Sequence, residues 1–416
     1  MLAAIERDLD DPAFLVVGIH SPKFPAQRDP ELVAAAIRRL GVTHPQVLDP
    51  DSTITHSFAV TGWPTMILVG PDESILGTIR GEPEPQALLR ALGDVMAQAR
   101  AGQRLNETPL PVRPATDDTG RWRFPGAVAA DGDRIAVADT GHDQVALLDA
   151  TGAETQRLGA GLLRRPCGLA LAGDVVWVAD TGNHRLVAFG LDGRDPEVVE
   201  APGLRSPWGL AWDGRRLYVA SAGTHQLWVL DPAEGALRLF AGTGVEGGRD
   251  GPTSEAHFAQ PSGIALDEGV LYVADAETSS IRGVADLDGR PVVRTVCGAG
   301  DLFGFGDRDG AGPVAELQHP IGLAAGAGAV WVADTFNHKV RRLDPATRRC
   351  TTAFGGGGSE LDEDPAPGPR GPARPGVPAF LEPEGIAVAG GDLLVADTGN
   401  HRVVAVDLAS GARRVL

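Results

Sequence analysis

A phrase that recurs six times between residues 125 and 416 constrains this sequence more than any other feature. Each copy opens with a Pro, which is followed two residues later by Gly in every copy except the first, where Ala127 stands there. It continues through short apolar runs and in its clearest form ends in Val-Ala-Asp-Thr-Gly-Asn-His-Arg. The copies open at Pro125, Pro166, Pro207, Pro261, Pro320 and Pro383, and the Asp position follows 14 residues later at Asp139, Asp180, Ser221, Asp275, Asp334 and Asp397. Repeats of roughly 40 residues or more are typical of propellers and solenoids.

The strand signals inside one copy indicate a propeller blade. Apolar runs such as 169–171, 175–178 and 185–189 are separated by Gly, Asp and Asn, which favour turns. Four such strands form one blade, and a blade buries its faces only against its neighbours. Six copies therefore predict a six-bladed ring with residues 412–416 as the outermost strand of the last blade. How the ring closes is left open by the sequence.

The distance between successive copies increases along the chain, with Pro-to-Pro spacings of 41, 41, 54, 59 and 63 residues. The added residues form three insertions between blades, at 242–260, 298–319 and 355–382. Connections between blades share a rim with the loop between the two middle strands, so these loops gather on one sector of one face. They either form a partner site or are surface loops that lengthened without a function. In both cases we expect them to contribute little to packing. The candidate binding residues for an unknown protein or small ligand are Arg249, Asp250, His257, Asp307, Arg308, Asp309 and His319.

The recurring Asp and His side chains resemble a ligand set, but their regular repetition argues for a scaffold. A catalytic site needs different residues that converge once, whereas these occur once in each copy. We therefore expect them to hydrogen-bond turn backbone, as such side chains commonly do. The residues concerned are Asp139, Asp180, Asp275, Asp334, Asp397, His184, His338 and His401. A metal site would instead need Glu255, His257, Glu316 and His319 to converge, and we predict neither a metal nor another cofactor.

The composition limits the kinds of partner that the protein can bind and the cellular compartment in which we expect it. The formal net charge of −18 argues against a nucleic-acid partner, because affinity for nucleic acid comes largely from cationic contacts to phosphate. No apolar run reaches about 18 residues, so we expect no membrane partner, and the first residues do not read as a signal peptide. Cys167, Cys297 and Cys350 are scattered and form no Cys-x-x-Cys pair, which is typical of a reducing compartment. We therefore predict a cytoplasmic protein.

Residues 1–104 alternate helix and strand signals ahead of the repeats. We expect helices over 2–9, 30–40, 54–58 and 85–99. A continuous apolar strand over 14–19 would lie in a sheet covered on both faces, followed by a short strand over 46–49 and a hairpin of 65–69 with 74–80. Residues 105–120 are rich in Pro and predict a linker. The expected domains are thus 1–104 and 121–416, joined by 105–120.

The tripeptide Trp63-Pro64-Thr65 stands directly before an apolar strand. Together with segments 17–24 and 41–51, the six repeats and the Gly-Arg-Asp and Asp-Arg-Asp-Gly insertions, it resembles the NHL-repeat proteins that carry an N-terminal thioredoxin-like domain. The resemblance covers nearly the whole chain. It implies an α+β multidomain protein, with an incomplete thioredoxin-like α/β domain followed by an all-β six-bladed NHL β-propeller. It also implies that Pro64 is the cis-proline on the substrate wall, with Trp63 and Thr65 beside it.

The sequence departs from that family at the start of the domain. The family places a central strand and a Cys-x-x-Cys turn before the first helix, whereas this sequence begins within that helix. We expect a start placed too late, or else another segment that covers the apolar edges at 16–17 and 67–68. Since thiol exchange requires a thiolate near Pro64, we predict a redox-inactive remnant fused to an NHL interaction or ligand-binding scaffold. The alternative is a thiol-disulfide oxidoreductase whose Cys-x-x-Cys lies upstream, so whether the protein is an enzyme stays open.

Overall fold

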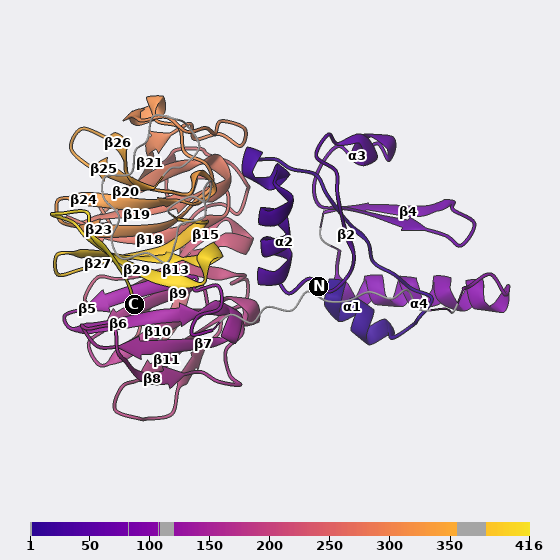
Figure 1. Cartoon of the computed structure of the whole chain (residues 1–416), viewed down its shortest axis with the longest axis horizontal. Coiled ribbons are helices and arrows are strands. Elements are labelled where there is room, and N and C mark those ends of the chain that lie inside the picture. Colours follow the sequence, from indigo (N-terminus) through magenta and orange to yellow (C-terminus); the bar gives the residue numbers. More distant parts are fainter. Residues whose placement is uncertain (1, 82, 107, 109–119, 356–379) are drawn as a thin grey trace. The chain divides into compact units, whose positions relative to one another are not determined.

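The computed structural model describes residues 2–81, 83–106, 108, 120–355 and 380–416. The chain divides into two units, residues 1–118 and 119–416 (Figure 1). Most of the expected linker and most of the third insertion lie outside the described residues. None of the helices in the described ranges is long and apolar enough to cross a membrane.

The first unit contains helices and two pairs of strands that do not share a sheet. Its elements are α1 (Leu2–Leu9), β1 (Gly18–His20), η1 (Pro25–Arg28), α2 (Pro30–Arg39), β2 (Gln46–Leu48), α3 (Thr53–Ser57), β3 (Thr65–Val69), β4 (Ile75–Arg80) and α4 (Pro85–Ala101). Strands β1 and β2 are parallel, whereas β3 and β4 form an antiparallel hairpin. The strand expected over 14–19 is therefore wrong in extent, because β2 pairs only with residues 18–20, and no strand among the described residues pairs with the apolar run before them.

Local side-chain contacts explain where the helices of this unit begin. The Asp29 carboxylate accepts a hydrogen bond from the second residue of α2, and Pro30 stands in the first turn, where its missing N–H is not needed. Asp49 does the same for α3 by accepting from the N–H groups of Ile54 and Thr55. Burial would raise the pKa of Asp49, but the hydrogen bonds from Thr55 and Ile54 outweigh it and lower the pKa to about 2.

The second unit is a six-bladed β-propeller, which confirms the six-bladed prediction (Figure 1). Each blade takes four antiparallel strands from one continuous segment, and the first strand of each blade lies against the first strands of its two neighbours. Blade 1 is β5 (Ala127–Asp131), β6 (Arg134–Asp139), β7 (Gln144–Leu148) and β8 (Glu154–Leu158). Blade 2 is β9 (Gly168–Ala172), β10 (Val175–Asp180), β11 (Arg185–Gly190) and β12 (Glu197–Val199). Blade 3 is β13 (Pro207–Trp212), β14 (Leu217–Ser221), β15 (Gln226–Asp231) and β16 (Ala236–Ala241).

Blades 4 and 5 each carry a fifth strand that comes from the insertion before them. Blade 4 is β18 (Pro261–Asp267), β19 (Val270–Asp275), β20 (Ser280–Ala285) and β21 (Val292–Gly298), with β17 (Gly251–Pro252) outside β21. Blade 5 is β23 (Pro320–Gly326), β24 (Ala329–Asp334), β25 (Lys339–Asp344) and β26 (Arg349–Gly355), with β22 (Gly310–Ala311) outside β26. Blade 6 is β27 (Pro383–Ala389), β28 (Asp392–Asp397), β29 (Arg402–Asp407) and β30 (Arg413–Val415), so the last strand is the outermost one, as expected.

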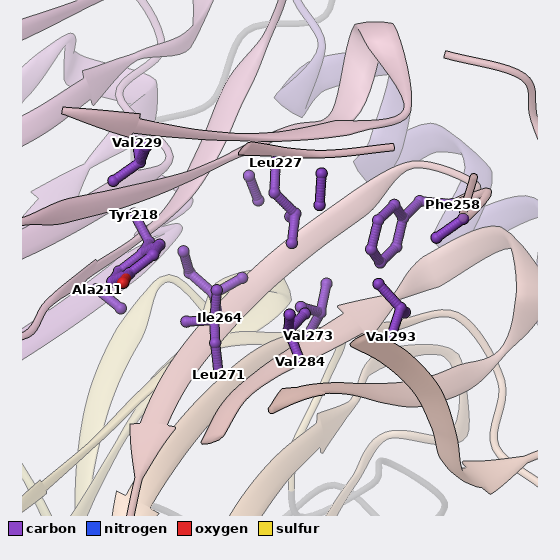
Figure 2. Close-up of a cluster of buried hydrophobic side chains, with 13 residues drawn as sticks. Ala211, Tyr218, Leu227, Val229, Phe258, Ile264, Leu271, Val273, Val284 and Val293 are labelled. Carbon is purple, nitrogen blue, oxygen red and sulfur yellow. The ribbon is translucent and has the colours of Figure 1, made fainter. Parts of the chain in front are cut away.

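One buried apolar cluster lies between each pair of neighbouring blades. Figure 2 shows the cluster between blades 3 and 4, where Phe258 packs among side chains of both blades. Every cluster contains one large apolar residue that stands three positions before the Pro of the following blade. These residues are Trp122, Leu163, Leu204, Phe258, Leu317 and Phe380. Because burial of apolar area is the main stabilising term between blades, this position belongs to the repeat as much as the Pro does.

Among the described residues, the ring closes without exchange of a strand between its first and last blades. Strand β27 lies beside β5, and the Thr398 hydroxyl donates to the Pro125 carbonyl at 2.7 Å. The Trp122 indole also donates to the Leu416 carbonyl at 3.3 Å. An equivalent Thr-to-Pro hydrogen bond joins blades 1 and 2, blades 2 and 3, and blades 5 and 6. Closure therefore uses the contacts that also join other neighbouring blades.

The Gly of Pro-x-Gly is required by the close approach of the innermost strands. A Cβ atom at Gly168 would lie 1.6 Å from the Trp208 carbonyl oxygen of the next blade. At Gly322 it would lie 1.8 Å from the Glu384 carbonyl oxygen. Both neighbours are backbone atoms of packed strands, so they cannot move aside without disturbing the ring.

We predict that Gly168→Ala destabilises the propeller by about 2–3 kcal/mol, as expected for an overpacked core. Gly391→Ala is the matched control, because nothing lies within 4 Å of a Cβ atom at that position. It should change the free energy of unfolding by less than about 0.5 kcal/mol. Denaturant unfolding followed by circular dichroism measures both, and equal stability of the two variants would contradict the packing argument.

Candidate functional site

The recurring Asp side chains fix the start of each innermost strand. Each carboxylate accepts a hydrogen bond from the backbone N–H two residues before the Pro of its own blade, at 2.6–2.8 Å. The donors are Arg123, Arg164, Ala259, Gln318 and Leu381, and the acceptors are Asp139, Asp180, Asp275, Asp334 and Asp397. In blade 3 the Ser221 hydroxyl takes the same role at 3.3 Å. All five Asp side chains are fully buried, and these contacts are internal to the scaffold.

The residue four positions after each Asp bonds to the neighbouring blade. It has a left-handed backbone, with φ between 47° and 59°, and its side chain accepts from the N–H directly before the next Pro. The histidines accept through Nδ1: His184 from Ser206, His225 from Gln260, His338 from Glu382 and His401 from Phe124. Asp143 and Ser279 replace His in blades 1 and 4, accepting from Arg165 and His319. The sequence analysis missed Asp143, His225 and Ser279, although their fixed register after the Asp position could have identified them.

The first insertion is held to blade 4 by a buried arginine. Arg282 on β20 is fully buried and donates to Asp250 at 2.6 Å and to Asp275 at 3.0 Å. It also donates to the backbone carbonyl of His257 at 3.1 Å. The N–H of Thr295 adds a second hydrogen bond to Asp250. Burial opposes the charge on Asp250, but these two donors outweigh it and lower its pKa below the ordinary value.

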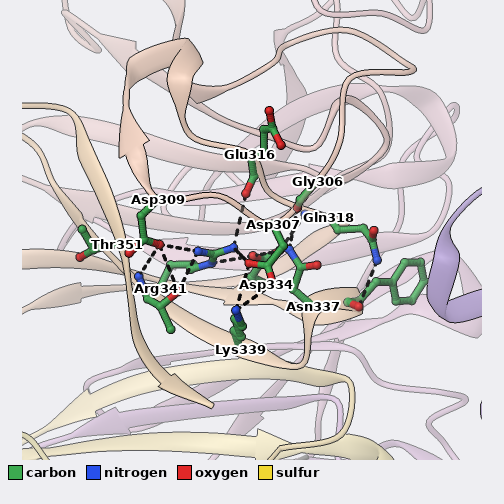
Figure 3. Close-up of polar contacts among 12 residues, drawn as sticks. Gly306, Asp307, Asp309, Glu316, Gln318, Asp334, Asn337, Lys339, Arg341 and Thr351 are labelled. Atoms are coloured by element: carbon green, nitrogen blue, oxygen red, sulfur yellow. Dashed lines mark hydrogen bonds and ion pairs between the residues drawn. The ribbon is translucent and has the colours of Figure 1, made fainter. Parts of the chain in front are cut away.

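The second insertion repeats this arrangement on blade 5 (Figure 3). Arg341 on β25 is 1% exposed and donates to Asp307 and Asp309 at 2.6 Å and to Asp334 at 2.7 Å. Lys339 adds an ion pair with Asp307 at 2.8 Å. Burial alone would lower the pKa of Arg341, but the surrounding carboxylates outweigh it and raise the pKa above its usual value. Arg341 therefore stays charged and joins the insertion to the repeat Asp of its blade.

These contacts correct the expectation that the insertions contribute little packing. The first insertion supplies Phe258, which is fully buried between blades 3 and 4, and the fifth strand β17. The second supplies Leu317, which is 1% exposed between blades 4 and 5, and the fifth strand β22. Asp250, Asp307 and Asp309 hold their own blades together, and a further role for them in binding a partner stays a prediction. Residues 356–379 of the third insertion lie outside the described residues.

The outer parts of the two insertions contact each other and carry the exposed side chains. A Cβ atom at Gly248 would lie 1.8 Å from the Gly300 carbonyl oxygen, so the two backbones touch. Arg249 pairs with Glu255 at 3.0 Å and Arg308 with Glu316 at 2.5 Å, and all four side chains are at least one-third exposed. Phe303 is 79% exposed and Val245 is 54% exposed. We call residues 243–250 and 299–308 the insertion platform.

The His and Glu residues that a metal site in the insertions would need together make contacts of their own. His319 stacks on Phe336 with a ring separation of 4.6 Å and lies 3.3 Å from the Glu277 carboxylate. The backbone N–H of His257 donates to Arg249 within the first insertion. Across the described ranges, no three His, Cys, Asp or Glu side chains are placed to hold a metal ion.

The tripeptide expected at the substrate wall lies in the first unit. The Trp63–Pro64 peptide bond is cis, and Trp63 is 66% exposed. Thr65 begins β3 and its hydroxyl donates to the Gly62 carbonyl at 2.6 Å. Cys167, Cys297 and Cys350 are all in the propeller, where they are buried thiols.

The comparisons with known proteins identify the repeat of the propeller as the NHL repeat. The family model of the NHL repeat matches residues 163–189 and 380–405, in blades 2 and 6. Over 461 residues the chain is 31% identical to "Protein SUPPRESSOR OF QUENCHING 1, chloroplastic" of Arabidopsis thaliana. Over 485 residues it is 32% identical to "NHL repeat-containing protein 2" of Bos taurus. These matches take in 99% and 98% of the chain.

The chain contains NHL repeats, and over nearly its whole length it is similar to NHL repeat-containing protein 2. It spans 43% of the length of the Arabidopsis relative and 64% of the bovine one. Among solved structures, an auxiliary nutrient binding protein from Bacteroides thetaiotaomicron matches with a TM-score of 0.52 and 16% identity, covering 68% of each chain. That likeness concerns the fold alone.

The role of Arg341 in the NHL propeller gives a prediction. Arg341→Met should destabilise the propeller by about 3–5 kcal/mol, because it leaves the fully buried Asp334 carboxylate without its cation. Arg308→Met is the matched control, since it removes an ion pair whose side chains are 57% and 37% exposed. It should cost less than about 1 kcal/mol. Thermal unfolding of both variants tests this, and a mild Arg341→Met variant would mean that the insertion is not part of the core.

Proposed function

We propose that the NHL propeller is a binding module and that the insertion platform is its partner site. Phe303 carries the proposal, because it is a large apolar side chain that is 79% exposed on an anchored backbone. Aromatic residues in such positions commonly supply much of the binding energy at protein interfaces. A partner protein with an apolar pocket fits this chemistry.

The anchoring of the insertion platform favours a partner site over loops that lengthened without a function. Two insertions use the same arrangement, in which a buried Arg on the third strand of the blade bonds to an Asp of the insertion. A surface that is already ordered loses less conformational entropy when a partner binds. Loops that lengthened without a function would not need this support, since surface loops tolerate insertion at little energetic cost.

We further infer that residues 1–104 form a thioredoxin-like domain that binds without exchanging disulfides. The order of helices and strands, the β3–β4 hairpin and the helix α4 that follows it support this inference. The exposed Trp63 beside Pro64 gives the domain an apolar contact surface. The oxidoreductase alternative places its reactive Cys-x-x-Cys upstream of residue 1, because the three cysteines of the given sequence are buried in the propeller. The cytoplasmic location and the absence of a nucleic-acid partner stay predictions, and the name of the Arabidopsis relative places that protein in the chloroplast.

A photo-crosslinking residue placed at Phe303 should capture a discrete partner from a lysate of the source organism. The same residue at Val198 is the control, because Val198 is 41% exposed on the outermost strand of blade 2, away from both insertions. After the partner is identified, Phe303→Ser should weaken its binding by about tenfold or more, the loss expected for an interface hot spot. The melting temperature should stay unchanged, since the side chain is exposed. Unchanged affinity in Phe303→Ser would refute the platform as the partner site.

The chain should not reduce insulin disulfides above background in the presence of a dithiol. The physical reason is that thiol exchange starts from an accessible thiolate, which buried cysteines do not supply. Insulin turbidity measures this directly, with a thioredoxin as positive control. Turnover that a single change such as Cys167→Ser abolishes would instead establish the oxidoreductase function.

A further inference from the structure

Three consecutive blades of the propeller carry an arginine at the same position of the repeat. This position lies two residues before the Pro, where the backbone N–H bonds to the repeat Asp or to Ser221. Blades 4, 5 and 6 have uncharged residues there, namely Ala259, Gln318 and Leu381. Blades 1, 2 and 3 have Arg123, Arg164 and Arg205, and a further arginine, Arg165, follows directly in blade 2. We call Arg123, Arg164, Arg165 and Arg205 the arginine rim.

No carboxylate in the described part of the chain forms an ion pair with any side chain of the arginine rim. The guanidinium groups of Arg123 and Arg205 donate only to backbone carbonyl groups, at 3.5 Å and 2.8 Å. Within the same described ranges, the Nε atoms of Arg123 and Arg165 are buried without a hydrogen-bond partner. Arg164 and Arg205 are exposed. Because a guanidinium has five N–H donors and a fixed charge, the rim keeps most of its capacity to bind an anion.

Each of the three repeated arginines lies against a glycine in its own blade, in the turn that follows the repeat Asp position. The glycine N–H donates to the arginine carbonyl at 2.7–3.2 Å, and a Cβ atom on the glycine would lie 2.5–3.0 Å from the arginine side chain. The missing Cβ therefore leaves room for the first part of the arginine stem. A stem that is already held in place loses less entropy when an anion binds. The pairs are Arg123 with Gly141, Arg164 with Gly182 and Arg205 with Gly223.

The charge of the arginine rim is opposite to that of the insertions. The repeat Asp carboxylates of blades 1 and 2 are fully buried and pair with other arginines, Arg157 at 2.7 Å and Arg185 at 2.8 Å, so they do not neutralise the rim. In the first two insertions, by contrast, the side chains of Asp250, Asp307 and Asp309 are 42–44% exposed. Charges act over only about 8 Å at physiological salt, so an anion responds to the rim rather than to the net charge of the chain.

The extent of the arginine rim favours an acidic peptide over a small anion or a nucleic acid. The cavity of about 50 Å³ on the propeller axis is lined by residues such as Trp208 and Glu384 and by none of the four arginines, so the rim does not enclose a small ion. A nucleic acid gains its affinity from many cationic contacts along its backbone, whereas the cations here end at blade 3 and acidic insertions follow. Arginines form bidentate pairs with carboxylates, and arginine clusters commonly recognise acidic motifs.

We propose that the arginine rim binds an acidic segment of a partner protein. Asp and Glu side chains of that segment pair with the exposed guanidinium groups of Arg164 and Arg205, and Arg123 and Arg165 add positive charge beside them. Since these cations are spread over three neighbouring blades, the segment binds in an extended form across the connections between the blades. The proposal does not rest on the insertion platform, so either one can fail without the other.

The test measures binding of fluorescein-labelled hexaglutamate to the full chain by fluorescence anisotropy in about 150 mM salt. Hexaglutamine is the uncharged probe, and an oligothymidylate of the same charge represents nucleic acid. Arg164→Gln combined with Arg205→Gln removes two exposed charges of the rim. The matched control is Arg194→Gln combined with Arg238→Gln. It removes the same charge from the same two blades, outside the rim, at side chains that are 58% and 59% exposed.

We expect hexaglutamate to bind the wild type and hexaglutamine not to bind. The rim variant should weaken hexaglutamate binding about tenfold, as for the loss of two exposed ion pairs. Its melting temperature should stay unchanged, because exposed side chains contribute little to stability. The control variant should change binding less than about twofold, and so should Phe303→Ser, since distant sites act independently. Absence of hexaglutamate binding to the wild type, an equal loss in the control variant, or tighter binding of the oligothymidylate than of hexaglutamate would overturn the proposal.

Discussion

The propeller depends on two hydrogen bonds at the start of every innermost strand. The backbone N–H two residues before each Pro bonds to the repeat Asp of the same blade, or to Ser221 in blade 3, and the next N–H bonds to a left-handed residue of the preceding blade. One contact sets the position of the strand within its blade, and the other sets the distance to its neighbour. Because both donors are backbone groups, neither contact needs a particular side chain at these two positions. Proline is excluded because it has no N–H, and the residue directly before each Pro has a left-handed backbone, with φ between 46° and 54°, which disfavours β-branched residues. The large apolar side chain just before them then fills the interface between the blades.

This arrangement explains how the connections between blades could lengthen. The hydrogen bonds fix only the last residues of each connection, so the residues before them are free to take other paths. Blades 4 and 5 used that freedom to add a fifth strand, anchored by Arg282 and Arg341. The interfaces of blade 4 with its neighbours are also the ones where Ala222 and Ala276 replace the Thr that bonds to the next Pro. Buried ion pairs and added apolar contacts accompany the loss of that hydrogen bond.

The sequence predicted the number of blades and the place of the last strand, because Pro-x-Gly, the alternating apolar runs and the turn residues are local signals. It did not predict the Arg282–Asp250 pair, whose members are 32 residues apart and meet only after β17 adds to the outside of β21. The strand expected over 14–19 was too long, because an apolar run does not specify a partner strand. The residues around the axis were visible as the variable position of the motif. Glu384 and Trp208 line one cavity only because the six blades close into a ring, so their common location could not be predicted from the sequence.

Closure without strand exchange has a consequence for how such a ring evolves. A ring sealed by an exchanged strand has one special interface, and the two segments that form it must change together. Here the joint between blades 6 and 1 is made by the same residue positions as the other joints. Each blade is therefore a complete unit of duplication. The start of its innermost strand contacts the blade before it, and the residues after its repeat Asp contact the blade after it. Gain or loss of one unit leaves the joining chemistry intact and changes only the width of the central channel.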